Sequence, residues 1–374
     1  MNDQELIYLM ALACQTRISI AQQQQLLQTM GSATEIFANR RDIVRSIDNL
    51  SPRAADALSD LDTALPRCES ELAYAQSHHI SIIGWNDEAY PARLRNCEDA
   101  PVVFFFLGKA NLNATHVVSI VGTRRCTERG RDICNEFVKG LSRLAPDTLI
   151  VSGLAYGIDV AAHRASLSHQ LPTVGVLAHG LDEIYPRTHR STAVEMLKQG
   201  GLITEYMSHT RPDKMNFVQR NRIVAGISDA TIVVESASHG GSLITADMAF
   251  GYARDVFAFP GRVGDEQSAG CNDLIRRDKA HLITSAEDFL EDMGWMPEEI
   301  EKEASKQPTL FPMLSPEEQQ AVNALSRADG DMSASALADA LNLPQPRLTP
   351  MMIELEMKGV VRLMAGNKYH LIGS

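Results

Sequence analysis

The stretch "HVVSIVGTRR", residues 116–125, decides the fold, because a continuous apolar run ends there in a glycine, a hydroxyl and two arginines. Further β-type runs with helical stretches between them follow at 147–153, 173–180, 201–205, 230–236, 255–261 and 280–284. Strands that alternate with helices predict βαβ units and an α/β fold with a mostly parallel, Rossmann-like sheet. Since the runs are continuously apolar, we expect helices on both faces of that sheet.

The flanking segments differ from this pattern and predict further domains. Residues 1–75 have helical spacing and predict a small helical domain, similar in kind to SAM or helix-hairpin-helix modules. The Rossmann-like domain is expected at 76–292, where two short β-type runs form an N-terminal extension. Residues 293–313 are acidic, contain three prolines and predict a linker. Residues 314–374 predict three helices and a hairpin, an arrangement typical of a winged-helix domain.

The bulk composition is that of a soluble, globular protein, and it limits the possible function classes. No apolar run is long enough for a membrane span, and the N-terminus is a poor secretory signal, so we expect a cytoplasmic protein. The six cysteines form no Cys-x-x-Cys pair and the eleven histidines lack ligand spacing, so neither a metal nor another cofactor is predicted. The net charge of −12 disfavours nucleic-acid binding, but two central segments, 120–143 and 187–222, are locally basic.

Three segments that follow predicted strands have the residue types of an anion site. Gly122, Thr123, Arg124 and Arg125 combine a close backbone approach, a hydroxyl and guanidinium groups, at the start of a helix whose N–H groups are free. Surface salt bridges are the alternative explanation for the two arginines, and for Arg125 a salt bridge facing the helix would serve equally well. Neither Gly-x-x-x-x-Gly-Lys-Ser/Thr nor Gly-x-Gly-x-x-Gly occurs, so NTP hydrolysis and dinucleotide redox chemistry are not supported.

The second segment, residues 213–230, places cations beside an aromatic ring. Lys214 and Phe217 suit a single strand of nucleic acid, because the ammonium binds phosphate and the ring stacks on a base. Phe217 could instead be a core residue. The candidates that complete this segment are Arg220, Asn221 and Arg222, although one arginine could simply brace the helix.

The third segment is a glycine turn into a helix. Gly240 and Gly241 permit close backbone approach, and Ser242 is a candidate helix cap. The remaining motifs give little support for an enzyme, since Gly-x-Ser-x-Gly and His-Glu-x-x-His are both missing. Asp159 and His163 lie four residues apart on one predicted helix face. They could form an acid–base pair, but we favour a contact that braces the helix.

Together these blocks resemble the core of the bacterial DNA-processing protein A family (DprA, also called Smf). The similarity covers residues 82–290 and includes "SIVGTRRCTERG", "IVSGLAYGIDVAAHRASL" and "FVQRNRIVAGISDATIVVESASHGGSLITA" in order. It implies a protein without catalytic activity that binds single-stranded DNA, dimerises and loads the recombinase RecA, as in natural transformation. The family's phosphate motif falls on Gly122, Thr123 and Arg124, its lysine and stacking ring on Lys214 and Phe217, and its pocket is completed by the Gly-Gly-Ser turn.

The flanking segments depart from DNA-binding patterns. The N-terminal region lacks the glycine hairpin with which helix-hairpin-helix modules contact DNA. The presumed reading helix of the C-terminal unit carries Glu354 and Glu356, which favours a surface for a partner protein. An alternative function is a nucleotide N-glycosidase of the related phosphoribohydrolase group, although "HGGSLITAD" lacks the proline, the third glycine and the glutamate of that group's motif.

Overall fold

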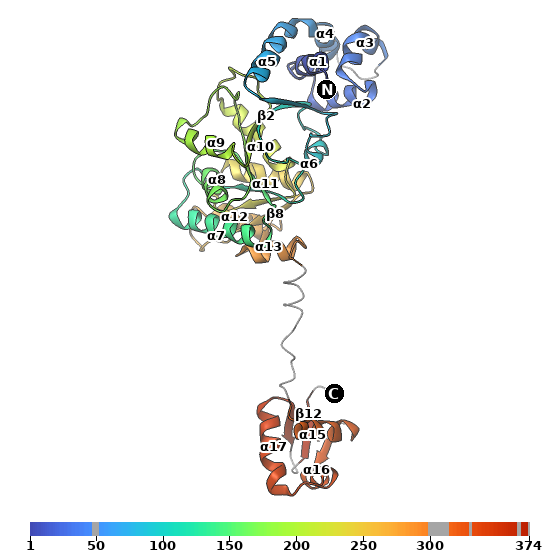
Figure 1. Cartoon of the computed structure of the whole chain (residues 1–374), viewed down its shortest axis with the longest axis vertical. Helices are drawn as coiled ribbons and strands as arrows, with labels where there is room; N and C mark the ends of the chain where they lie inside the picture. Colours follow the sequence, from blue (N-terminus) through green and yellow to red (C-terminus); the bar gives the residue numbers. More distant parts are fainter. Residues whose placement is uncertain (47–51, 298–313, 329–330, 365–367, 373–374) are drawn as a thin grey trace. The chain divides into compact units, whose positions relative to one another are not determined.

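The structure is a computed structural model of the whole chain. It describes residues 1–46, 52–297, 314–328, 331–364 and 368–372 (Figure 1). The chain divides into two compact units, Met1–Met296 and Pro297–Ser374. Most of the predicted acidic linker, residues 298–313, lies outside the described residues.

A nine-stranded sheet in the order β1-β2-β6-β5-β4-β3-β7-β8-β9 forms the centre of the first unit. The strands are β1 (Ser81–Gly84), β2 (Val103–Gly108), β3 (Val117–Val121), β4 (Leu149–Ser152), β5 (Thr173–Val176), β6 (Gly201–Thr204), β7 (Ala230–Val233), β8 (Asp255–Ala258) and β9 (His281–Leu282). From β6 to β9 neighbouring strands are parallel, whereas β2 is antiparallel to both β1 and β6. The mostly parallel sheet predicted from the apolar runs is confirmed.

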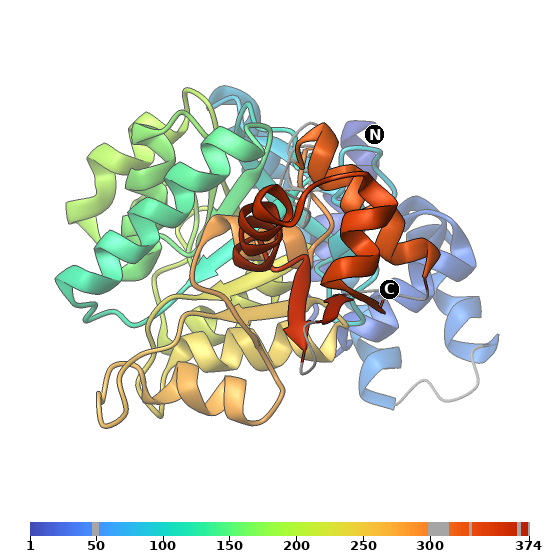
Figure 2. The ribbon, with the colours of Figure 1, turned by 90° about the horizontal axis from the view of Figure 1, so that it is seen from below.

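Helices cover both faces of this sheet (Figure 2). They are α6 (Ala92–Arg95), α7 (Glu128–Leu144), α8 (Ile158–Ser168), α9 (Arg190–Met196), α10 (Lys214–Gly226), α11 (Gly241–Gly251), α12 (Ala269–Arg276) and α13 (Ala286–Asp292). Alternate residues of β3 enter two cores: Val118 and Ile120 pack with α7, α8 and α13, while Val117 and Val121 lie in the core that contains α10 and α11. Burial on both faces explains why the strand sequence is continuously apolar.

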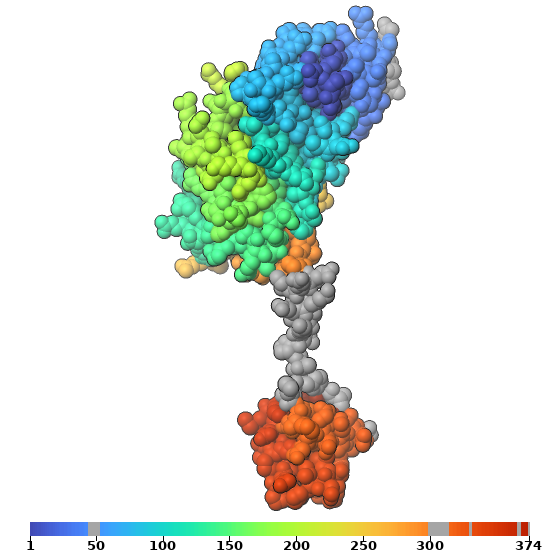
Figure 3. Space-filling view, in the orientation of Figure 1, coloured from blue at the N-terminus to red at the C-terminus, as the bar shows by residue number. Residues whose placement is uncertain are grey.

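The N-terminal helices belong to the same compact unit as the sheet. They are α1 (Asp3–Ala13), α2 (Ile20–Met30), α3 (Ala33–Ser46), α4 (Pro52–Ser59) and α5 (Leu65–Ser77), with a 3-10 turn at Leu61–Ala64. Their apolar side chains, among them Leu9 and Leu26, join the same core as side chains of β1 and β2. The space-filling view shows the surface of the N-terminal helices continuous with that of the sheet region (Figure 3). The helical character of this region is confirmed, while a domain boundary at residue 75 stays a prediction.

The second unit contains α15 (Pro316–Arg327), α16 (Ala334–Leu341) and α17 (Gln345–Met357) with the strands β10 (Asp331–Ser333), β11 (Val361–Met364) and β12 (Lys368–Leu371). Ser315 caps α15 in a reciprocal capping box with Glu318. The strands form an antiparallel sheet in the order β10-β12-β11. The short β10 was not predicted, because three residues carry no periodic signal. The predicted hairpin turn, residues 365–367, lies outside the described residues, and the winged-helix assignment stays a prediction.

None of the helices in the described parts of the chain combines the length and the apolar composition that crossing a membrane requires.

Candidate functional site

An open cavity of about 1030 Å³ lies at the carboxyl ends of β3, β4 and β7, and we call it the central cavity. From β3 the chain continues through β4, β5 and β6 on one side of the sheet, and then returns to place β7 on the other side. Open α/β sheets bind ligands at such a reversal, because the loops diverge there and leave a crevice. The cavity is lined by Gly122 to Arg125 from the loop after β3, and by side chains of α10 and the first turn of α11.

Gly122 is required by packing within the protein. A Cβ atom at this position would lie 2.5 Å from Cγ1 of Ile158 and 2.9 Å from the carbonyl oxygen of Glu235. Packing alone therefore accounts for the glycine, and its role in the approach of a ligand stays a prediction, although Gly122 lines the cavity. The loop is fixed by its neighbours: the Thr123 N–H donates to the Glu235 carbonyl at 2.7 Å, and the Arg125 N–H to Oγ1 of Thr123 at 3.2 Å.

The N-terminus of α7 is also occupied by the protein itself. The buried carboxylate of Glu235, which follows β7, accepts hydrogen bonds from the Thr127 N–H at 2.9 Å and the Thr127 hydroxyl at 2.5 Å. A carboxylate at this position satisfies the helix dipole as an external phosphate would. The anion site predicted at the start of α7 is therefore closed, and only the side chains of the preceding loop face the cavity.

The N-terminus of α11 is open instead. Its N-cap residue is Gly240, and no side chain from the described residues caps the helix. A Cβ atom at Gly240 would meet its nearest neighbour at 3.4 Å, and one at Gly241 at 3.8 Å, so these glycines leave room that no packing demands. The prediction that Ser242 caps the helix is wrong: its buried hydroxyl donates at 2.9 Å to Oγ of Ser236, in the loop after β7. Free N–H groups at a helix start can bind an anion.

Helix α10 brings the predicted lysine and aromatic ring to the cavity. Lys214, Phe217 and Asn221 are spaced along one face of the helix, and all three line the cavity. The guanidinium of Arg124 lies over the ring of Phe217, 5.3 Å from its centroid. Phe217 is half-buried, so the reading of this residue as pure core is wrong. The ring of Tyr185 lies 5.8 Å from that of Phe217 and adds a second aromatic surface.

The other two arginines of α10 are structural. Arg220 is buried, and its Nη1 donates to the carbonyl oxygens of Gly153, at 2.7 Å, and of Val176, so the guanidinium ties the ends of β4 and β5 together. Burial lowers the pKa of Arg220 to about 10. Arg220 lines the floor of the cavity, whereas Arg222 does not line it.

Arg222 forms a buried ion pair with Glu205. Burial raises the pKa of the Glu205 carboxyl, and the adjacent guanidinium of Arg222 opposes that shift. The structure therefore does not bring the predicted site residue Arg222 to the cavity, since a closer partner inside the protein holds its charge.

Asp159 and His163 do not contact each other as predicted. Nδ1 of His163 lies 2.7 Å from the hydroxyl of Thr173, and burial together with the charge of Arg220 lowers the pKa of His163 to about 3. Asp159 is buried at the cavity wall. Burial raises the pKa of its carboxyl, an effect that Arg220 counters.

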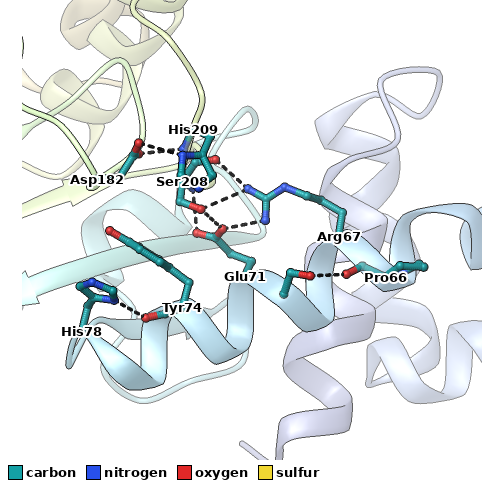
Figure 4. Close-up of polar contacts among 9 residues, drawn as sticks. Pro66, Arg67, Glu71, Tyr74, His78, Asp182, Ser208 and His209 are labelled. Carbon is teal, nitrogen blue, oxygen red and sulfur yellow. Dashed lines mark hydrogen bonds and ion pairs between the residues drawn. The ribbon is translucent and has the colours of Figure 1, made fainter.

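An N-terminal helix positions the loop that precedes α10 (Figure 4). The buried carboxylate of Glu71 on α5 accepts hydrogen bonds from the N–H of Ser208 at 2.8 Å and from its hydroxyl at 2.5 Å. Arg67 donates to Glu71 at 2.8 Å and to the Ser208 carbonyl at 2.6 Å, so both sides of the contact are satisfied. Beyond Ser208, the N–H of His209 donates to Asp182. The same loop continues to Arg211, which lines the cavity.

Sequence reasoning missed several lining residues. They are Glu183, Tyr185, Arg187, Arg211 and His239. Arg187 and Arg211 lie within a segment recognised as basic, but no motif marked them, because long loops bring them to the cavity. Six basic and three acidic side chains line the cavity, so it is locally positive although the chain is acidic. Among the described residues, no cluster of His, Cys, Asp and Glu suits a metal ion.

The nine-stranded sheet and the central cavity lie within a segment that matches a known family. A family model described as DNA recombination-mediator protein A matches residues 81–294, which include all strands of the nine-stranded sheet and the whole central cavity. The chain belongs to this family.

Relatives with similar sequences match most of the chain. It is 35% identical to the DNA processing protein DprA of Bacillus subtilis over 67% of this chain and 84% of that protein. It is 31% identical to the protein Smf of Escherichia coli over 81% of this chain and 80% of that one. The X-ray structure of DprA from Streptococcus pneumoniae superposes with a TM-score of 0.66 at 30% identity, covering 78% of this chain and 98% of that structure.

A second solved family member comes from Helicobacter pylori. Its structure matches with a TM-score of 0.52 at 27% identity, over 57% of this chain and 95% of that one. That work describes a single-stranded DNA binding mode of the Helicobacter protein. Both structures share the DprA α/β core, and so the Rossmann-like fold assigned from the strand pattern is the family's fold.

Proposed function

We propose that this DprA family member binds single-stranded DNA in the central cavity without catalysis, protects the strand and loads the recombinase RecA onto it. In this proposal the protein works in the cytoplasm as a homodimer and serves homologous recombination, including natural transformation. The binding residues are Thr123, Arg124, Arg125, Lys214 and Phe217, with Asn221 and the open turn at 240–242 completing the cavity.

One observation carries the proposal: Arg124 lies over the ring of Phe217 in a cavity where the ammonium of Lys214 is exposed and has no ion-pair partner among the described residues. A cation that is not neutralised by a carboxylate can bind a backbone phosphate, and a ring beside it can stack on the adjoining base. Single strands offer both groups together, whereas in a duplex the base faces are covered. The names of the relatives in Bacillus subtilis and Streptococcus pneumoniae, and the binding mode described for the Helicobacter protein, support the same assignment.

A salt-titrated comparison of single- and double-stranded DNA tests the binding step. We expect oligo-dT to bind more tightly than a duplex of equal length at every salt concentration. Lys214→Ala should reduce the salt slope of log K by about 0.7, the value for one lost phosphate contact on a single strand. Lys198→Ala removes an exposed lysine that does not line the cavity, and it should leave the slope unchanged. Preference for the duplex, or a Lys214→Ala slope equal to wild type, would contradict the proposal.

RecA loading needs its own measurement. Strand exchange by RecA on DNA coated with single-strand-binding protein should accelerate when the wild-type chain is added, and Phe217→Ala should reduce that acceleration along with DNA affinity. If the chain binds oligo-dT but leaves strand exchange unchanged, the DNA-binding part of the proposal survives and the loading part fails.

Asp159 gives a specific reason to test the alternative N-glycosidase function. Its carboxyl lines the cavity, and its raised pKa is a property that a general acid requires. We favour binding because Arg220, held by two backbone carbonyls, lies beside Asp159 and gives it a structural partner. Incubation with nucleoside monophosphates should release no free base, and turnover that is lost in Asp159→Asn would favour the enzyme instead.

A further inference from the structure

A second cavity of about 550 Å³ lies beside the central one, between α7 and α8, and we call it the α7–α8 cavity. Its lining comes from the loop after β3, the first turns of α7, one face of α8 and the residues Tyr156, Gly157 and His189. Arg124 and Arg125 line both cavities, so the two are joined at the loop after β3.

The charge of the α7–α8 cavity is strongly positive. Arg124, Arg125, Arg131 and Arg164 line it against one acidic side chain, that of Asp132. All four arginines are exposed, and within the described part of the chain none forms an ion pair with a carboxylate. Four guanidinium groups in one hollow repel one another, and an anion that binds there relieves this repulsion.

One hydrogen bond within the protein orients each of the side chains of Arg131 and Arg164. Nε of Arg164 donates to the hydroxyl of Thr192 at 3.3 Å, and Nη2 of Arg131 reaches the carbonyl oxygen of Cys126 at 3.5 Å. Each guanidinium therefore keeps further N–H donors for a ligand, since the group carries five. The planar guanidinium group can donate two parallel N–H hydrogen bonds to phosphate oxygens.

Tyr156 supplies an aromatic face at the mouth of the same cavity. The side chain is 47% exposed, although it follows a fully buried strand. Its ring lies 5.0 Å from that of His189, at an interplanar angle of 70°. His189 is buried, with Nδ1 2.9 Å from the Leu154 carbonyl, so a fixed ring contacts Tyr156 while about half of the Tyr156 side chain stays exposed.

We propose that the α7–α8 cavity is a second nucleotide subsite for the same DNA strand, continuous with the central cavity through Arg124 and Arg125. Arg131 and Arg164 bind backbone phosphates there, and Tyr156 stacks on a base. This inference rests on the proposed function, because it extends the strand that occupies the central cavity. The combination in each cavity is the same: unpaired cations beside a ring that is partly open to solvent.

The test compares oligo-dT lengths, with affinity measured by fluorescence anisotropy on the full chain. In wild type, affinity should rise with length and rise again once the strand reaches the second cavity. Tyr156→Ala should leave the shortest bound oligomers unaffected and weaken the longer ones about five-fold or more, the cost of one lost stacking contact. Tyr156→Phe keeps the ring and should behave as wild type.

The charge part of the proposal has a matched control on the same helix. Arg131→Gln and Arg164→Gln should each reduce the salt slope by about 0.7 for long oligomers only. Arg129→Gln removes an exposed arginine of α7 that lines neither cavity, and its slope should equal that of wild type. Urea unfolding of every variant checks that the fold is retained.

Each other outcome overturns the inference in a different way. If the Tyr156 and Arg164 variants bind long oligomers as wild type does, the strand does not enter the α7–α8 cavity, although the proposed function stands. If short and long oligomers weaken equally, these residues act on the central cavity and form no subsite. If free dTMP binds as tightly as the strand and loses affinity in Tyr156→Ala, the cavity is a mononucleotide site. Failure of wild type to bind any oligo-dT would refute the proposed function together with this extension.

Discussion

The guanidinium of Arg124 lies over the ring of Phe217, 5.3 Å from its centroid, although three strands, β4, β5 and β6, separate the two residues in sequence. The contact joins the loop after β3 to the first turns of α10. A cation against the face of a ring is attracted by the negative potential of the π system, and it also keeps the planar group in one orientation. Charge and ring therefore form one unit in the central cavity.

This coupling predicts that the two side chains contribute non-additively to DNA affinity. Arg124→Ala and Phe217→Ala should each weaken oligo-dT binding, and the double variant should lose less than the sum of the two by about 0.5–1 kcal/mol. Phe217→Tyr keeps a ring under the guanidinium and should retain the coupling with Arg124→Ala. Strictly additive losses would show that the contact has no energetic role in the complex.

We expect Arg220 to contribute more to the stability of the fold than to DNA binding. Arg220→Ala leaves the carbonyl oxygens of Gly153 and Val176 without their donor and removes the cation beside the buried Asp159. We expect the free energy of unfolding to fall by about 3–5 kcal/mol, as for other buried charges that lose a partner. Urea unfolding measures it, and the exposed Arg124→Ala should change stability by less than about 0.5 kcal/mol. A fully stable Arg220→Ala protein that has lost DNA binding would identify Arg220 as a phosphate ligand.

The contact between Glu71 and Ser208 should couple the N-terminal helices to the loop that lines the central cavity. Glu71→Gln replaces an acceptor of the Arg67, Ser208 N–H and Ser208 hydroxyl bonds by a group that accepts at one atom only. We expect a loss of about 1–3 kcal/mol in unfolding free energy and weaker oligo-dT binding, because the loop to Arg211 loosens. Glu69→Gln changes an exposed glutamate on the same helix and should alter neither property. Unchanged stability in Glu71→Gln would contradict this role for α5.

His163 should make the protein less stable in acid. Its pKa is lowered from 6.5 to about 3 by burial and by the charges of Arg220 and His189, so the folded state keeps the ring neutral where the unfolded chain binds a proton. Stability from this residue is complete above pH 6.5 and is lost as the pH falls toward 3, at up to about 1.4 kcal/mol per pH unit.

The matched variant isolates this residue from the neighbouring Asp159. The stability of wild type relative to His163→Gln, measured by urea unfolding, should be constant above pH 7 and decline steadily from pH 6 to pH 4. Asp159 and Arg220 are common to both proteins and largely cancel in the difference. A difference independent of pH over this range would mean that His163 is protonated in the folded state.

Much of the fold followed from local patterns. Continuous apolar runs such as 116–122 marked the strands, and Ser315-Pro316 marked a helix start, because both signals depend on residues close in sequence. The order of the strands did not follow. That β2 pairs with β6 and not with β3 depends on packing between segments about a hundred residues apart.

The same distinction between local patterns and long-range packing applies to the candidate site. The sequence by itself determined that a glycine, a hydroxyl and arginines follow one strand, and that Lys214 and Phe217 share a helix turn, because these are facts of spacing. Only the tertiary structure decided which charges are available. Glu235 fills the start of α7, Arg220 binds two strand ends and Arg222 is paired with Glu205, while Arg124 and Lys214 stay exposed. Burial and the nearest partner determine whether a charge can meet a ligand, and both come from residues distant in the chain.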